Sequence, residues 1–525
     1  MKRIEIFDST LRDGAQGESV SYSVEDKLNI VRSLDKLGID YIEAGNPFSN
    51  PKDAEFFERV KGISLSHARI VAFGSTRRRG VPVTEDKNCA ALLRAGTGCV
   101  SVFGKSSDWQ VREVLGTTPE ENLRMIFDTV DFFVRAGKRV FFDGEHFFDG
   151  YKQNPYYAVE TLEAAEKAGA CKLVLCDTNG GCFPDEIAAV TAEMEKRFPG
   201  KIGIHCHNDT GCAVAATIAA VKAGADHVQG TYIGIGERCG NANLAAAIAN
   251  LQLKLGYLCI PPDRVSRLTK TARYISEVSN VRLPHSMPYV GKSAFAHKGG
   301  MHVDGVMKNS AAFEHINPES VGNRRQILLS EVSGRTALMS KVAEFVPNLR
   351  KDSPELQKLV DKLKALEYEG YQFEAATASF EMVVLKELGY FKPFFELELF
   401  RIIGEQDAAD RHMASAMVKL RVGDRYEITA DEGDGPVHAL DRALRKALEV
   451  FYPGLSGVRL IDYKVRVMDT GKATAALVRV LIETSDGENI WTTVGVSTDI
   501  INASIHALVD SMEYKLYRDS MANNE

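Results

Sequence analysis

Two histidines separated by a single residue lie in the segment HCHND, where His205 and His207 end a run of mostly apolar residues. If this run is a strand, both side chains point to the same face, because side chains alternate along an extended chain. Two imidazoles on one face can bind one divalent metal ion, and they can also form a hydrogen-bonded pair without a metal. Other residues must decide between these two interpretations.

Two further segments supply oxygen atoms for such a metal site. Asp13 lies in STLRDG, directly after the first predicted strand, and Asn241 lies in the glycine-rich segment GIGERCGN. A carboxylate with two imidazoles leaves coordination positions for water or substrate on Mg²⁺, Mn²⁺, Co²⁺ or Zn²⁺. Asn241 is a candidate fourth ligand, although an amide in a glycine-rich loop is also a common loop cap.

Three more polar residues lie at the ends of predicted strands or directly after them. Arg12 can stabilise negative charge that develops during a reaction, unless it forms an ion pair with Asp8. Glu145, in FFDGEH, can act as an acid or a base or can orient a substrate. Thr178, in CDTNG, can donate a hydrogen bond to a carboxylate. Each residue is weak evidence alone, and their shared position strengthens the prediction of an active site.

These residues need a scaffold that brings the ends of strands together. From residue 3 to about 255, short β-branched runs alternate with amphipathic stretches at a spacing of roughly 25 to 40 residues, which is typical of βα units. The predicted strands are 3–8, 39–45, 68–74, 97–104, 138–145, 172–178, 201–207 and 225–232. Eight such units predict a closed α/β barrel of the (β/α)8 TIM type, whose active face lies at the carboxyl ends of the strands. We assign residues 1–260 to this catalytic domain.

The remaining residues form two other predicted parts. Residues 261–375 read as a helical linker subdomain that carries a glycine-flanked loop, GGMHVDG. His302 in this loop can accept a proton, or it can be an ordinary surface histidine. Residues 376–525 contain a βββα pattern twice, at about 391–451 and 458–516, which predicts one pseudo-symmetric α+β domain. Such a domain suits ligand sensing or assembly, and a purely structural dimerisation domain is the alternative.

The composition excludes several functional classes. The net charge of −7 gives no basic surplus for nucleic acid or anionic membranes. The first residues lack the apolar core of a signal peptide, and no apolar run of about 18 residues follows, so we expect a cytoplasmic protein. The nine cysteines occur between Cys89 and Cys259 without a CxxC pair, which predicts reduced structural thiols.

The ordered set STLRDG, DTNG, HCHND, GIGERCGN and GGMHVDG resembles the DRE-TIM metallolyase superfamily, and within it the isopropylmalate, homocitrate and citramalate synthase group. The segments GDGPVHALDRAL and STDIINASIHALVD resemble the C-terminal allosteric domain of that group. The resemblance therefore covers nearly the whole chain. It implies a metal-dependent acyltransferase that condenses acetyl-CoA with a short 2-oxo acid and hydrolyses the thioester.

The resemblance also implies roles for individual residues. The divalent metal, with Mg or Mn expected first and Zn or Co as alternatives, would be bound by Asp13, His205, His207 and Asn241. Arg12 would polarise the 2-oxo acid, and Thr178 would hold its carboxylate. Glu145 would contact the reaction centre of the acyl-CoA. His302 would be the general base, delivered by the partner subunit of a homodimer.

Two positions depart from the pattern of the group. Ala15 stands where many relatives have a glutamate, with Glu18 nearby, and Phe313 stands where a tyrosine is common. The phenylalanine puts a hydroxyl role at position 313 in doubt, and the sequence alone does not show whether Glu18 compensates for Ala15.

The acceptor is predicted from three segments, DGAQGESVSYSVEDKL, EAGNPFSNPKD and VFGKSSDW, which resemble the citramalate branch. That branch implies pyruvate as the acceptor, a place in isoleucine biosynthesis and isoleucine as the feedback inhibitor. A 2-isopropylmalate synthase with 2-oxoisovalerate as acceptor, in leucine biosynthesis, is the near alternative. Homocitrate synthase is a more distant one, and a hydroxyacyl-CoA lyase of the same superfamily is an alternative from another class.

Overall fold

The computed structural model describes residues 2–328, 342, 353–406, 412–468, 475–487 and 489–522. The chain forms two compact units. The first comprises 1–296 and 314–326, and the second comprises 297–313 and 327–525. The predicted linker segment 261–375 is thus divided between both units, and its residues 329–341 and 343–352 lie outside the described residues.

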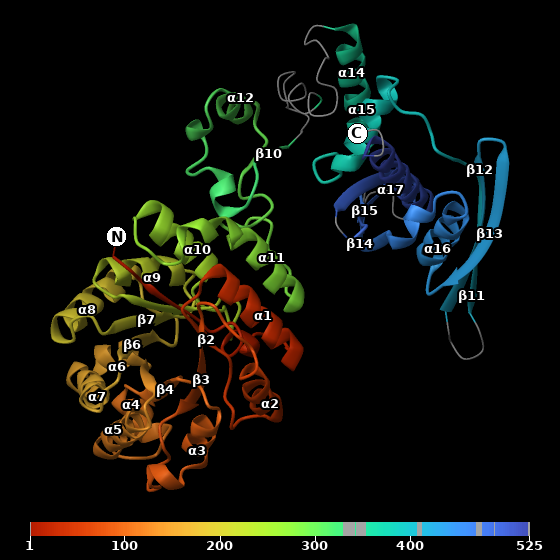
Figure 1. Ribbon diagram of the computed structural model, residues 1–525. Coiled ribbons are helices and arrows are strands. Elements are labelled where there is room, and N and C mark those ends of the chain that lie inside the picture. The colour runs from red at the N-terminus through yellow and green to blue at the C-terminus, as the bar shows by residue number, and fades with distance from the viewer. Residues whose placement is uncertain are drawn as a thin grey trace. The chain divides into compact units, whose positions relative to one another are not determined.

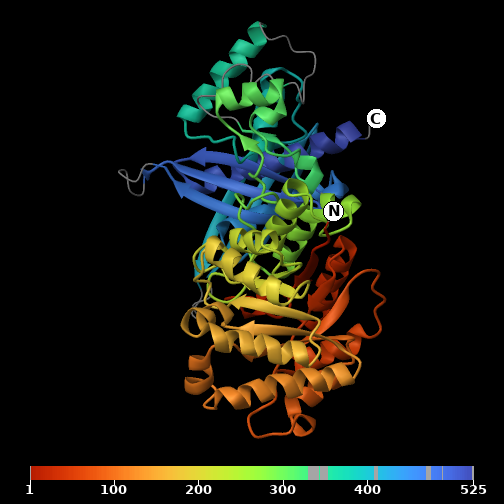
Figure 2. The same cartoon turned by 90° about the vertical axis from the view of Figure 1, so that its left-hand side faces the viewer.

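The first unit is a closed barrel of eight parallel strands (Figures 1 and 2). The strands are β1 Glu5–Asp8, β2 Tyr41–Glu43, β3 Arg69–Ser75, β4 Cys99–Lys105, β5 Arg139–Glu145, β6 Lys172–Asp177, β7 Ile202–Cys206 and β8 His227–Gly230. Each strand pairs with the next one along the chain, and β8 closes the barrel by pairing with β1. This confirms the predicted TIM barrel and all eight of its strands.

Helices surround the barrel (Figure 1). They are α1 Val24–Leu37, α2 Pro51–Val60, α3 Lys87–Arg94, α4 Asp108–Glu113, α5 Pro119–Arg135, α6 Phe147–Gln153, α7 Pro155–Lys167, α8 Pro184–Arg197, α9 Ala213–Lys222, α10 Leu244–Ala249 and α11 Leu268–Val278. Shorter helices of this unit are η1 Gly14–Gln16, η2 Val83–Glu85, η3 Asn250–Lys254, η4 Pro262–Arg267 and η6 Pro318–Val321.

Local sequence signals fix the ends of these helices. The Ser23 side chain accepts a hydrogen bond from the backbone N–H of Asp26, and Asp26 reciprocates, so α1 begins with a capping box. The helix ends at Gly38, whose φ of 98° favours glycine. Such caps satisfy backbone groups that a helix leaves unpaired at its ends, and they orient each helix for packing on the barrel.

The barrel interior changes from apolar to polar along its axis. At the amino-terminal end, five buried side chains pack together: Phe7, Tyr41, Val71, Cys99 and Phe141. Toward the carboxyl ends of the same strands, the inward positions carry Glu43, Ser101 and Asp143, which are also buried. Buried polar groups are costly without partners, so a polar layer at this end of a TIM barrel indicates a functional site.

The second unit begins with short elements and two helices. These are α12 Gly300–Lys308, η5 Ser310–Ala312, α14 Pro354–Tyr368 and α15 Thr377–Glu387. The two-residue strands β9 Ala296–His297 and β10 Gln326–Ile327 form a small sheet where the chain passes between the units.

Two three-stranded antiparallel sheets follow, each with one helix (Figure 1). The first consists of β11 Glu396–Gln406, β12 His412–Val422 and β13 Arg425–Gly433, and α16 Pro436–Glu449 packs on it. The second consists of β14 Arg459–Val467, β15 Val478–Ser485 and β16 Ile490–Ser497, with α17 Ile500–Ala522 packed on it. The short helix η7 Pro453–Gly457 lies between the copies. The predicted βββα repeat is confirmed, although residue 474 of one predicted strand lies outside the described residues.

The first of these sheets has one buried and one exposed face. Its inner face carries buried side chains such as Val418 and Leu420, which pack with α16. Its outer face carries exposed apolar side chains from all three strands: Leu399, Ile403, Met413, Tyr426 and Ile428. We call these five residues the outer apolar face.

Two further predictions concern cysteines and membranes. All nine cysteines are free thiols, as predicted. None of the helices in the described ranges has the length and apolar character needed to span a bilayer.

Candidate metal centre

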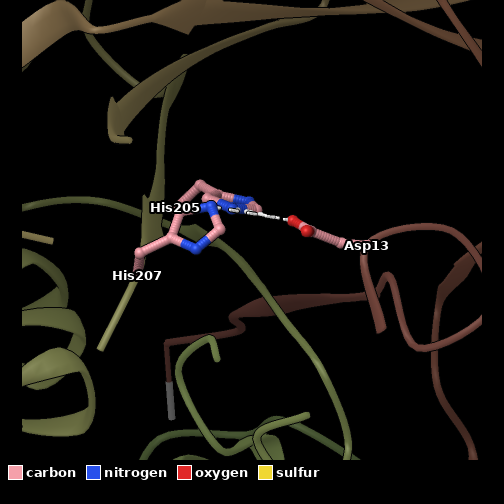
Figure 3. A group of neighbouring side chains, drawn as sticks. All are labelled: Asp13, His205 and His207. Carbon is pink, nitrogen blue, oxygen red and sulfur yellow. Dashed lines mark ion pairs between the residues drawn. The ribbon is translucent and has the colours of Figure 1, made fainter. Parts of the chain in front are cut away.

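Asp13, His205 and His207 meet at the carboxyl ends of β1 and β7 (Figure 3). His205 belongs to β7 and His207 follows it, so both rings point the same way, as the alternation along a strand predicts. Asp13 Oδ2 lies 3.3 Å from His205 Nε2 and 3.9 Å from His207 Nε2. All three side chains are buried. Their donor atoms lie within 4.8 Å of one another, which suits a single bound ion.

Asn241 completes this group of side chains. Its backbone forms an isolated β-bridge with His207, and its Nδ2 lies 3.0 Å from Asp13 Oδ2 and 3.2 Å from His205 Nε2. The glycine-rich loop makes room for it, since a Cβ at Gly236 would lie 2.0 Å from Asn241 Oδ1. Gly236 is therefore needed for the amide to reach the site.

Two buried polar atoms at this place lack a hydrogen-bond partner among the described residues. They are Asn241 Oδ1 and His207 Nδ1. Buried polar atoms normally have partners, and a missing ion or water is one reason for an exception. If the Asn241 amide turns by half a rotation, its oxygen takes the place where Nδ2 now faces Asp13 and His205. The four residues therefore fit a divalent cation with mixed oxygen and nitrogen ligands.

The protonation states also suit a cation. Burial would raise the pKa of Asp13, but the charge of Arg12 and the contact with His205 outweigh it and hold this pKa well below its usual range. Burial, with His205 nearby, lowers the pKa of His207 to about 4. For His205, burial is outweighed by the contact with Asp13, which raises its pKa. At neutral pH the site therefore contains an ionised carboxylate and at least one neutral imidazole, the forms that bind metals.

Arg12 lies beside this centre but is not paired with Asp8. Its Nε donates to Glu43 Oε2 at 2.7 Å, and its guanidinium carbon lies 3.8 Å from the centre of the Phe73 ring. Asp8 instead accepts from the backbone N–H and the hydroxyl of Thr10. Glu43 and the ring hold the guanidinium in one orientation, with Nη1 at 3.5 Å from the metal-site carboxylate.

Glu145 and Thr178 lie at the same rim. Glu145 Oε2 is 2.7 Å from Lys105 Nζ, an ion pair between the ends of β5 and β4. Thr178 Oγ1 accepts a hydrogen bond from the backbone N–H of His146 at 2.8 Å. His146 adopts a left-handed conformation with φ of 58°, which is uncommon for a residue with a side chain. Because the Thr178 oxygen accepts here, its hydroxyl hydrogen can donate to a substrate carboxylate.

His302 belongs to the second unit, in α12. Its ring stacks on Phe313 with the ring centres 4.2 Å apart and the planes inclined by 21°. The phenylalanine that departs from the family pattern thus supports the His302 ring by packing. A role for His302 at the barrel rim stays a prediction.

Three residues at the rim were not predicted from the sequence. Glu43 and Lys105 end β2 and β4, so the rule that selected the other strand-end residues would have selected them too. Arg238, in GIGERCGN, donates to Asp209 and to the carbonyl of Thr178 at 2.7 Å. It joins the loops after β6, β7 and β8, and no local signal distinguishes it from an ordinary loop arginine.

A closed eight-stranded barrel with this rim defines a metal-dependent TIM-barrel enzyme. The sequence profile described as HMGL-like matches residues 3–275, the homocitrate synthase post-HMGL domain-like profile matches 289–370, and the LeuA allosteric (dimerisation) domain profile matches 374–516. The chain therefore belongs to the HMGL-like family, in the group that contains the (R)-citramalate synthases.

Relatives of nearly full length support this placement. The chain is 51% identical over 520 residues to an (R)-citramalate synthase of Aquifex aeolicus, covering 99% of this chain and 98% of the relative. It is 47% identical over 521 residues to an (R)-citramalate synthase of Geobacter sulfurreducens, with the same coverage. A probable 2-isopropylmalate synthase of Methanopyrus kandleri is 33% identical over 97% of both chains.

Proposed function

We propose that the chain condenses acetyl-CoA with pyruvate and hydrolyses the thioester, which gives (R)-citramalate and CoA. The observation that carries this proposal is the convergence of Asp13, His205, His207 and Asn241 beside the fixed guanidinium of Arg12. Five relatives named (R)-citramalate synthase are 43% to 51% identical to this chain, and these five favour pyruvate over 2-oxoisovalerate. A probable 2-isopropylmalate synthase is 33% identical, and a sixth (R)-citramalate synthase is 30% identical.

The metal would be held by Asp13, His205, His207 and Asn241. A divalent ion bound there would supply positive charge that polarises the ketone of the 2-oxo acid. Mg²⁺ or Mn²⁺ is our first proposal, because a carboxylate and an amide oxygen are ligands that both ions accept.

The other residues act on the two substrates. Arg12 stabilises the oxygen that gains charge, since Glu43 keeps its guanidinium in place before the reaction begins. The hydroxyl of Thr178 donates to the carboxylate of pyruvate. Glu145, held by Lys105, faces the acyl group. His302 of the partner subunit removes a proton from the methyl group of acetyl-CoA, and the resulting carbon attacks the ketone.

A cavity close to this rim suits the anionic part of acetyl-CoA. A cavity of about 450 Å³ lies at the ends of β3 and β4. Its basic lining residues are Arg77, Arg78, Arg79 and Lys105, and its apolar lining includes Phe103 and Met125. Lys105 lines this cavity and also forms the ion pair with Glu145. Guanidinium groups bind phosphates well, so we propose that the phosphates of acetyl-CoA bind here.

The second unit is proposed to mediate dimerisation and feedback inhibition by isoleucine. The outer apolar face leaves five large side chains exposed to solvent, which suits contact with a second copy of the chain. We assign 1–260 to catalysis, 261–375 to linker subdomains and 376–525 to regulation. The cytoplasmic location stays a prediction.

Inhibition by isoleucine is tested by removing residues after about 380, which should leave residual turnover insensitive to isoleucine. Unchanged inhibition of that shortened chain would reject this role.

Thiol release from acetyl-CoA tests the proposed reaction. Purified protein with Mg²⁺ or Mn²⁺ is given pyruvate, 2-oxoisovalerate or 2-oxoglutarate, and kcat/KM is compared between acceptors. We expect a clear preference for pyruvate. A preference for 2-oxoisovalerate would keep the mechanism and change the product, whereas absence of release with every acceptor would favour a hydroxyacyl-CoA lyase.

A further inference from the structure

A chain of buried hydrogen bonds crosses the barrel beneath the metal centre. It begins at His205 in β7, whose Nδ1 lies 3.0 Å from Gln229 Oε1 in β8. Gln229 Nε2 donates to Asp143 Oδ1 in β5 at 3.0 Å, and Ser101 Oγ in β4 donates to Asp143 Oδ2 at 2.5 Å. All four side chains are buried. This series of hydrogen bonds therefore links β7, on the ligand side of the barrel, to β4 on the opposite wall.

The direction of each hydrogen bond follows from the Asp143 carboxylate, which can only accept hydrogen bonds when it is ionised. The hydroxyl of Ser101 donates to one oxygen of Asp143, and the amide nitrogen of Gln229 donates to the other. Since the amide nitrogen of Gln229 is used at Asp143, its oxygen must face His205. An amide oxygen only accepts, so the proton between Gln229 and His205 belongs to Nδ1 of the histidine.

The other side of the His205 ring agrees with this assignment. With Nδ1 protonated, the neutral ring has its lone pair on Nε2, and Nε2 is the atom that faces Asp13 and Asn241. A metal ligand must present a lone pair to the ion. Gln229 therefore keeps the histidine in the one tautomer that can coordinate from Nε2.

We propose that Gln229 is a positioning residue for the metal centre, and that Asp143 and Ser101 set its orientation. This inference rests on the proposed function, because it assumes that His205 binds the divalent ion. A partner on the outer nitrogen of a ligating histidine fixes the ring and typically changes metal affinity by about 10- to 100-fold when it is removed.

A second buried residue of β8, His227, offers a matched control. His227 lies on the same strand, two residues before Gln229, and is likewise buried and inward-facing. Its ring contacts Phe7 and Phe141 at the apolar end of the barrel, away from the metal centre. A general loss of packing in β8 would therefore appear in both positions, whereas a loss of histidine orientation would appear only at Gln229.

The experiment measures the dissociation constant of Mn²⁺ by electron paramagnetic resonance on the full chain after removal of metals. The variants are Gln229→Met, which keeps the length of the side chain, Asp143→Asn, Ser101→Ala and the control His227→Gln. We expect Mn²⁺ to bind about 10- to 100-fold more weakly to Gln229→Met, with smaller effects of Asp143→Asn and then Ser101→Ala. His227→Gln should change the melting temperature without changing the affinity for Mn²⁺.

The outcomes separate the inference from the function on which it rests. Wild-type protein that binds no Mn²⁺ would overturn the proposed function itself. Wild-type protein that binds Mn²⁺ together with an unchanged affinity of Gln229→Met would overturn the positioning role alone. If Gln229→Met does not fold, nitrogen-15 chemical shifts of His205 in the metal-free wild type decide, measured at a pH at which the ring is neutral. A proton on Nδ1 with a bare Nε2 supports the inference, and a proton on Nε2 with a bare Nδ1 contradicts it.

Discussion

The barrel and the C-terminal sheets place polar and apolar side chains in opposite ways. In the barrel, charged and polar groups such as Asp13, Glu43 and Asp143 are buried, and each has a partner inside the same unit. In the first C-terminal sheet, large apolar groups such as Tyr426 and Ile428 are exposed. Buried polar groups indicate chemistry, and exposed apolar groups indicate a contact still to be made. This difference fits our proposals that the first unit holds a metal centre and that the second unit mediates assembly and regulation.

The largest expected effect comes from removing a ligand in the barrel. His207→Ala should lower turnover by at least about 10³-fold, because a bound cation supplies several kcal/mol of charge stabilisation. The ring lies at the rim and not in the apolar layer, so the fold should persist. Initial rates and circular dichroism measure the two effects, and His67→Ala, on the opposite end of the barrel sheet, is the control. Full activity in His207→Ala would refute the site.

The next effect concerns a buried carboxyl group in the second unit. Burial raises the pKa of Glu513 to about 7, although the backbone N–H of Phe394 donates to it at 3.1 Å. A raised pKa contributes stability that is present below about pH 4.5 and is lost as the pH rises through 7. Relative to Glu513→Gln, the wild type should therefore lose up to about 3 kcal/mol of unfolding free energy between pH 4.5 and 8.

Tryptophan fluorescence can follow this pH effect in the full chain. Trp491 is buried in the second unit, whereas Trp109 is in the barrel unit and half exposed. In a Trp109→Phe background, the denaturation signal comes from Trp491 alone. If the unfolding free energy depends on pH in the same way with and without the Glu513→Gln substitution, the Glu513 carboxyl does not cause the loss of stability.

A smaller effect is expected at the outer apolar face. Ile428→Asp puts a charge on a surface that we propose to be covered by a second copy, so the dimer should dissociate at least about 10-fold more readily. Analytical ultracentrifugation measures this change. Tyr156→Asp is the matched control, because Tyr156 is an exposed aromatic residue of the barrel. Equal effects of the two variants would place the dimer contact elsewhere.

The smallest effect is expected at the proposed phosphate cavity. Arg79→Ala should raise the KM for acetyl-CoA roughly 3- to 10-fold with little change in the KM for pyruvate, because exposed ion pairs contribute modestly. Arg94→Ala removes the same charge from the outside of α3 and should change neither constant. An equal rise in KM for both substrates would argue against a phosphate role for Arg79.

The sequence predicts the barrel better than it predicts the network inside it. The β-branched runs and the polar residues that end them were sufficient for the strands and for Asp13, His205 and His207. Gln229 and Asp143 were missed because each lies inside a strand, where one polar residue does not show its partner on another strand. Their connection depends on the register of β5, β7 and β8, which only the closed barrel defines.

We propose that the barrel by itself provides one metal centre per chain. Titration of metal-free protein with Mn²⁺ in a calorimeter, for the wild type and for Asp13→Asn, tests this claim most directly. We expect one Mn²⁺ per chain in the wild type and at least about 100-fold weaker binding in Asp13→Asn, because the variant loses the only ionised ligand of the four. No binding by the wild type, or equal binding by both proteins, would contradict the claim.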